Sequence, residues 1–174
     1  MSDDLAVGVD PRFTPIRAVV DTSALVPARL RHDLQQAAQI GAFVGIWSPW
    51  IIAELNRVLV WRWIKDAPPN RAANDLTDAN ERRCGMAAKT MMEWLLPSFE
   101  LVAPLPPYPP AWSALSDQWD HPICAAAKLG RASHVISQNS HDYPPAGSDG
   151  RHVYEGIEYL DGEAFLALLT GNLE

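Results

Sequence analysis

The stretch Ala18-Val-Val-Asp-Thr-Ser-Ala-Leu-Val26 decides the fold class of this chain. Its short apolar run ends at Asp21, and Thr22 and Ser23 follow as residues typical of turns and helix caps. The run predicts a buried strand, and open α/β sheets bind their ligands at the carboxyl ends of parallel strands. Asp21 is therefore a candidate site residue. The alternative is that Asp21 only caps the helix that follows.

A second carboxylate lies on a predicted helix. The segment Trp47-Ser-Pro-Trp-Ile-Ile-Ala-Glu-Leu55 has Ser48 as a capping residue and Pro49 at the first helical position. Apolar residues then recur with helical spacing as far as residue 59, and the helix is expected to reach Lys65. Glu54 lies beside this apolar stripe in the second turn.

Further polar candidates come late in the chain. A helix is predicted from Asp120 to Gly130, because an acid can cap its start and glycine commonly ends a helix. A strand at 134–136 follows, and then the polar turn Ser137-Gln-Asn-Ser-His-Asp-Tyr-Pro144. Asn139 and Asp142 therefore follow a strand, as Asp21 does.

The remaining pattern alternates strands with helices, which predicts an α/β fold. We expect a central parallel sheet of four to five strands with helices on both faces. Residues 1–15 are expected to form a flexible extension and residues 16–174 a single domain. The other predicted elements are strands at 17–20, 43–47, 99–103 and 153–154, and helices at 27–40, from 75–80 to 96, 112–118 and 161–169.

Composition limits the class of protein. At 174 residues and 48% hydrophobic content, the chain can build one core. We find no apolar run long enough to span a membrane and no signal peptide, so a cytoplasmic location is expected. The two cysteines do not suggest a disulfide, and Cys124 is predicted to be a buried thiol.

Four motifs appear in order along nearly the whole chain. They are Val20-Asp-Thr-Ser23, the segment from Ser48 to Leu55, the segment from Asp120 to Gly130, and the turn from Ser137 to Pro144. This order resembles the PIN (PilT N-terminal) domain family of metal-dependent nucleases. The resemblance implies a three-layer α/β/α fold. It also implies a Mg²⁺- or Mn²⁺-dependent endoribonuclease similar to the toxins of bacterial toxin–antitoxin pairs.

The resemblance also implies roles for individual residues. Asp21 and Asp120 would be direct metal ligands, and Glu54 would hold a water on the metal or a second ion. The fourth position departs from the common pattern, because Asn139 stands where many relatives have Asp. Asn139 is the preferred fourth catalytic residue. Asp142 is either the substitute metal ligand or an Asx-turn residue.

Two nearby residues are secondary candidates. Asp117 is a further acid close to Asp120, and Ser137 either orients a water or caps its own turn. Three or four converging carboxylates would repel one another without a cation, which favours a divalent metal. An amide at position 139 keeps an acceptor oxygen but removes a negative charge, so it weakens binding of a second ion.

The formal net charge of −7 is unfavourable for a protein that binds phosphates, although bound metals reverse the local field. Basic side chains on the predicted helices are interpreted first as solvated surface, with phosphate contacts as the alternative. They are Arg29, Arg31, His32, Arg57, Arg62, Lys65, Arg82, Arg83 and Lys89.

Two functions are consistent with these patterns. The first is an endoribonuclease that cleaves single-stranded RNA. If it is the toxin of a toxin–antitoxin pair, its partner is a separate antitoxin protein that covers the site. The second is a non-catalytic PIN-fold scaffold that binds RNA or protein, which Asn139 favours. Seven tryptophans are explained by core packing, by a protein interface or by stacking on bases. Trp61 and Trp63 cannot both face one core stripe, so we expect a homodimer or a protein partner.

Overall fold

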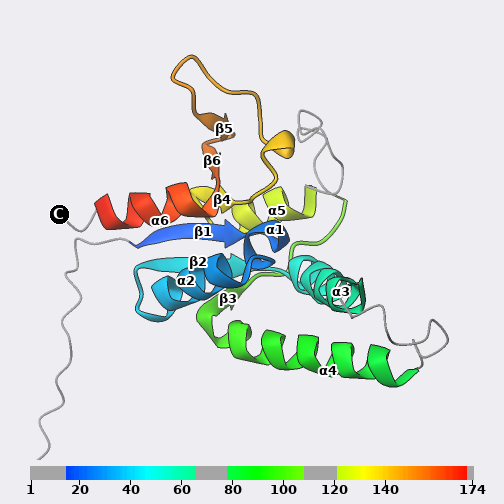
Figure 1. Ribbon diagram of the computed structural model, residues 1–174. Helices are drawn as coiled ribbons and strands as arrows, with labels where there is room; N and C mark the ends of the chain where they lie inside the picture. The colour runs from blue at the N-terminus through cyan, green and yellow to red at the C-terminus, as the bar shows by residue number, and fades with distance from the viewer. Residues whose placement is uncertain (1–14, 66–77, 108–120, 172–174) are drawn as a thin grey trace, which may run out of the picture.

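The computed structural model describes residues 15–65, 78–107 and 121–171 (Figure 1). The extension expected at residues 1–15 lies outside the described residues except for residue 15, and so does the helix expected at 112–118. The strands are β1 (Ile16–Val20), β2 (Phe43–Trp47), β3 (Phe99–Leu101), β4 (His134–Ile136), β5 (His152–Tyr154) and β6 (Ile157–Leu160). The helices are α1 (Thr22–Leu25), α2 (Ala28–Gln39), α3 (Pro49–Lys65), α4 (Asp78–Leu95), α5 (His121–Leu129) and α6 (Gly162–Gly171), with 3₁₀ turns at Leu96–Ser98 and Ser140–Asp142.

The six strands form one sheet in the order β3-β2-β1-β4-β6-β5. All neighbouring pairs are parallel except β5 and β6, so the α/β class is confirmed. The expectation of four to five strands was too low, because β6 was not predicted. The strand expected at 153–154 is the antiparallel edge strand β5. It turns into β6 through Glu155 and Gly156, whose positive φ values of 50° and 81° suit a two-residue hairpin turn.

Helices cover both faces of the sheet. Phe165 of α6 packs edge-to-face on Phe43 of β2 with ring centroids 4.9 Å apart, and it also contacts His134 of β4. Gly130, at the end of α5, approaches Ile46, which lies three residues after Phe43 on β2. A Cβ on Gly130 would lie 2.6 Å from the Ile46 side chain. Because strand side chains alternate between faces, Phe43 and Ile46 point to opposite sides of the sheet. α6 and α5 therefore lie on opposite faces.

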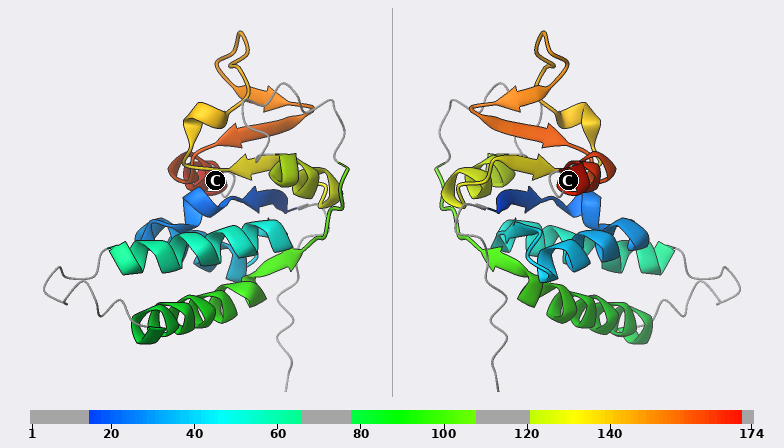
Figure 2. Two further views of the ribbon diagram at one scale, coloured as in Figure 1. Left: turned by 90° about the vertical axis from the view of Figure 1, so that its right-hand side faces the viewer. Right: turned by 90° about the vertical axis from the view of Figure 1, so that its left-hand side faces the viewer.

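α3 and α4 pack against each other at the end of the molecule opposite the β5–β6 hairpin (Figure 2). The side of α3 facing the core buries Ile51, Leu55 and Leu59. None of the helices in the described ranges is both long enough and apolar enough to cross a membrane. Cys124 is buried as predicted, and burial raises the pKa of its thiol.

One basic residue is not on the solvated surface where the sequence placed it. Arg31 is only 9% exposed, and its Nη1 donates hydrogen bonds to the carbonyl oxygens of Leu25 (2.8 Å) and Val26 (3.2 Å). The short helix α1 ends at these carbonyls, which have no partners within the helix. Burial lowers the pKa of the Arg31 guanidinium. Arg31 thus supports the segment that connects α1 to α2.

Candidate metal-binding cleft

The carboxyl ends of β1 and β4 are neighbours at one edge of the sheet. Val20 pairs with Ile136, and the backbone N–H of Asp21 donates to the Ile136 carbonyl at 2.9 Å. β1 points toward α1 and α3 (Figure 1). Asp21 and Ser137, each the first residue after its strand, are therefore placed side by side where parallel sheets form ligand sites.

The Asp21 side chain is 7% exposed and is held through one of its two oxygens. Its Oδ2 accepts from the Ser23 backbone N–H (3.3 Å), the Ser23 hydroxyl (2.6 Å) and the Ser137 hydroxyl (2.9 Å). Within the described part of the chain, no hydrogen bond reaches Oδ1. The same carboxylate caps α1, so the helix-cap alternative is also correct. Capping occupies Oδ2 and leaves Oδ1 for a ligand.

The two serine hydroxyls tie the β1 and β4 ends together. Their Oγ atoms lie 2.9 Å apart, and each also accepts a backbone N–H: Ser23 from Gln138 at 2.8 Å and Ser137 from Asn139 at 3.2 Å. Ser23, Ser137 and Asp21 make three oxygen–oxygen contacts, but the two serines have only two hydroxyl protons between them. When the carboxylate accepts a hydrogen bond from both serines, both protons point to it and neither lies between the two serine oxygens. This small network fixes the direction of the Asp21 side chain.

Glu54 is held from the neighbouring segment. The Thr22 hydroxyl donates to Glu54 Oε2 at 2.9 Å, and Arg57, one turn further along α3, lies 4.0 Å from Oε1. Thr22 directly follows Asp21, so the two carboxylates are linked through the N-cap and the first residue of α1. Thr22 was predicted as a turn or helix-cap residue, and its contact with a residue 32 positions away has no local sequence signal.

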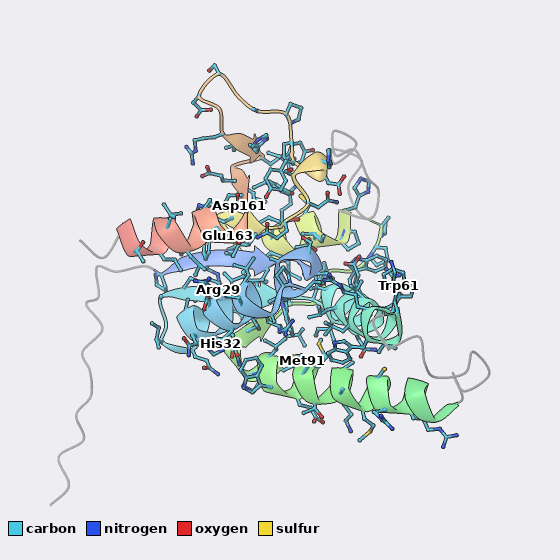
Figure 3. All side chains as sticks on the ribbon, in the orientation of Figure 1. Arg29, His32, Trp61, Met91, Asp161 and Glu163 are labelled. Carbon is cyan, nitrogen blue, oxygen red and sulfur yellow. The ribbon has the colours of Figure 1, made fainter. Side chains whose placement is uncertain are left out.

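The turn after β4 contributes the amide and the third carboxylate. Asn139 Nδ2 donates to Asp142 Oδ2, and the Tyr143 hydroxyl donates to the Ser137 carbonyl. Burial, with smaller contributions from the charges of Asp161 and Asp21, raises the pKa of Tyr143 to about 12. Tyr143 therefore keeps its proton and acts as a fixed support for this turn. Asp161 directly follows β6 and is labelled in Figure 3.

These side chains line one cleft of about 510 Å³ at the carboxyl edge of the sheet. Its lining residues are Asp21, Thr22, Ser23, Val26, Pro27, Glu54, Val58, Arg62, Ile123, Ser137, Asn139 and Asp142. Five of the predicted candidates thus line the same cleft: Asp21, Glu54, Asn139, Asp142 and the secondary candidate Ser137. Asp120 and Asp117 lie outside the described residues. Arg62 also lines the cleft, a position that its sequence context did not predict.

The donors in the cleft suit a hard divalent cation. Carboxylate, amide and hydroxyl oxygens are the ligands that Mg²⁺ prefers, and it usually keeps several waters. Among the described residues, no three His, Cys, Asp or Glu side chains are grouped closely enough to form a metal site by themselves. Asp21 would therefore bind an ion together with the uncharged oxygens around it, and Glu54 would hold a water on that ion. The unpartnered Oδ1 of Asp21 fits this role.

The tryptophans divide between core and surface. Trp47 is fully buried and stacks on Phe99 at 4.5 Å, whereas Trp61 is 59% exposed and Trp63 is half-buried. Trp61 therefore does not pack into the core stripe of α3, which is consistent with the expectation that the pair cannot both do so.

Comparison of the chain with models of known protein families finds no match, and comparison with curated proteins finds no matching sequence. The functional assignment accordingly rests on the geometry and chemistry of the cleft.

Proposed function

We propose that this chain is a PIN-type, Mg²⁺- or Mn²⁺-dependent endoribonuclease that hydrolyses phosphodiester bonds of single-stranded RNA in the cytoplasm. One observation carries the proposal. Asp21 and Glu54 come from different elements, yet both line one cleft at the carboxyl edge of a parallel sheet, with the oxygens of Asn139 and Asp142 beside them. The order of the motifs along the chain supports the same proposal.

Asp21 and Glu54 would have different tasks in this reaction. A bound Mg²⁺ or Mn²⁺ supplies the positive charge that offsets the phosphoryl and leaving oxygens, and it makes water a better nucleophile. Asp21 would bind the ion through Oδ1, because Ser23 and Ser137 hold Oδ2. Glu54, held by Thr22, would orient the attacking water and accept its proton.

A non-catalytic scaffold remains the second candidate, and one contact favours it. Asn139 contributes no negative charge, and its amide donates a hydrogen bond to Asp142. Both features reduce the capacity of this turn to hold a second ion. A scaffold would bind RNA or a protein without cleaving it. The presence of both Asp21 and Glu54 in the cleft favours the nuclease.

The test is cleavage of a fluorescent single-stranded RNA by the purified chain in Mn²⁺ or in chelator. We expect cleavage only with metal, and none by Asp21→Asn. The matched control is Asp33→Asn, which removes the same charge from a half-buried position of α2 that does not line the cleft. RNA binding by the parent chain without any cleavage in Mn²⁺ would favour the scaffold.

We further propose that the chain acts as the toxin of a toxin–antitoxin pair and forms homodimers. The exposed Trp61 is consistent with a protein partner, because aromatic side chains are enriched at protein interfaces relative to the rest of the surface. It lies on α3, at the end of the molecule away from α6 (Figure 3). Analytical ultracentrifugation of the parent and of Trp61→Ala tests the dimer, and a monomeric parent would contradict it.

A further inference from the structure

The cleft continues along α3, away from its acidic end. Glu54, Val58 and Arg62 are spaced four residues apart and all line the cleft, so they form one row on the surface of the helix. Eight residues of α-helix rise about 12 Å. Arg62 therefore lies roughly two helical turns from the carboxylate end, within the same cleft.

Arg62 differs from Arg57 and Arg29 because none of the described carboxylates neutralises its charge. It is exposed, and none of the described carboxylates lies within ion-pair distance of it. Arg57 on the same helix lies 4.0 Å from Glu54, and Arg29 on α2 lies 3.8 Å from Asp33. In a chain with a net charge of −7, a guanidinium that lines the cleft and has no carboxylate partner among the described residues attracts an anion.

Val58 lies between Glu54 and Arg62 in this row, and Val26, Pro27 and Ile123 are the other apolar residues that line the cleft. Apolar side chains provide no hydrogen-bond partners for a phosphate, but they can pack against a base or a sugar. Along α3, the cleft thus presents a carboxylate, an apolar side chain and a guanidinium in a row. An extended polynucleotide repeats the same alternation of phosphate and apolar ring.

We propose that Arg62 is a substrate-binding residue that holds a phosphate of the RNA strand beyond the one that is cleaved. The strand would lie along α3, with its reacting phosphate at Asp21 and Glu54 and the intervening nucleotide against Val26 and Val58. This inference rests on the proposed ribonuclease function. It adds the direction in which the strand leaves the site and the residue that positions it.

The test compares Arg62→Gln with the parent, with Arg62→Lys as a charge-restoring variant. Arg131→Gln is the matched control. Arg131 is exposed and lies shortly before the first residue of β4, at the end of this strand opposite the cleft. KM and kcat are measured on single-stranded RNA in Mn²⁺, and affinity is measured against salt with a phosphorothioate RNA that resists hydrolysis. One phosphate contact on a single strand contributes about 0.7 to the salt slope, which is about fivefold in affinity at 0.1 M salt.

We expect Arg62→Gln to raise KM about fivefold, to leave kcat near the parent value and to reduce the salt slope by about 0.7. Arg62→Lys should restore the slope, and Arg131→Gln should match the parent. If the parent cleaves RNA but Arg62→Gln keeps the parent's KM and slope, the Arg62 inference is wrong and the nuclease proposal survives. A fall in kcat with unchanged KM also overturns it. If the parent neither binds nor cleaves RNA, the nuclease proposal itself fails.

Discussion

Replacement of Asp21 separates its structural role from its chemical role. The carboxylate caps α1 and accepts hydrogen bonds from Ser23 and Ser137 through Oδ2, while Oδ1 is left for an ion. Asn keeps one acceptor oxygen in the same position, whereas Ala removes both. We therefore expect both variants to lose RNA cleavage but only Asp21→Ala to lose substantial stability.

The magnitude follows from the contacts that are lost. Loss of an N-cap side chain costs about 1 kcal/mol. Of the two hydroxyl hydrogen bonds to Oδ2, only one is lost in net terms, because Ser23 and Ser137 can then donate one to the other; this bond contributes about 1 kcal/mol, so Asp21→Ala should cost about 2 kcal/mol. For a chain of 174 residues, each kcal/mol lowers Tm by about 2–4 °C, which gives a decrease of about 4–8 °C. Asp21→Asn should change Tm by less than about 3 °C, because weaker hydrogen bonds are offset by reduced repulsion with Glu54.

The assay is thermal unfolding in chelator, followed by circular dichroism, with cleavage measured on the same preparations. Equal melting temperatures for Asp21→Ala and the parent would refute the capping network. Cleavage by Asp21→Asn at the parent rate would refute the role of Oδ1. The two refutations are independent, since one concerns the fold without metal and the other concerns the reaction.

Two more predictions address the charge in the cleft and the pH dependence of the fold. Asn139→Asp should lower Tm in chelator and enlarge the stabilisation by millimolar Mn²⁺, because it adds a crowded carboxylate that is also a ligand; equal Mn²⁺ shifts in both proteins would exclude position 139 from the site. Burial lowers the pKa of His134 despite the opposing effect of Glu158. The unfolded chain therefore binds a proton near pH 6.5 that the folded chain does not, and stability should fall as the pH drops through 6.5 toward the lowered folded pKa. His134→Gln should lose less of its Tm between pH 7.5 and 5.5 than the parent, and an identical loss would rule out this contribution.

The parts of the fold that follow local rules were predictable from the sequence. β1 ends where the apolar run ends, and α3 spans Pro49–Lys65 as expected from its capping Ser48 and helical spacing. β6 was missed although Ile157-Glu-Tyr-Leu160 alternates with the period of a strand. Its turn, Glu155-Gly156, has glycine at only one of the two positive-φ positions and lacks the usual Asn-Gly or Asp-Gly signal.

The candidate site was predictable only in part, because its members are positioned by contacts between distant segments. Asp21 and Asn139 could be found from their places after strands. The bond from Thr22 to Glu54 and the burial of Arg31 depend on how α1 packs beside α2 and α3, which no local pattern specifies. The same applies to Arg62, whose sequence context is that of any exposed helix residue.

The most direct test of the central claim is anomalous diffraction from crystals of the parent chain grown or soaked with millimolar Mn²⁺. We expect a manganese peak in the cleft between α1, α3 and the turn after β4, with Asp21 Oδ1 as a direct ligand. We also expect the peak to be absent in crystals of Asp21→Asn under the same conditions. An ordered cleft without manganese in the parent, or an ion bound there without Asp21, would contradict the account.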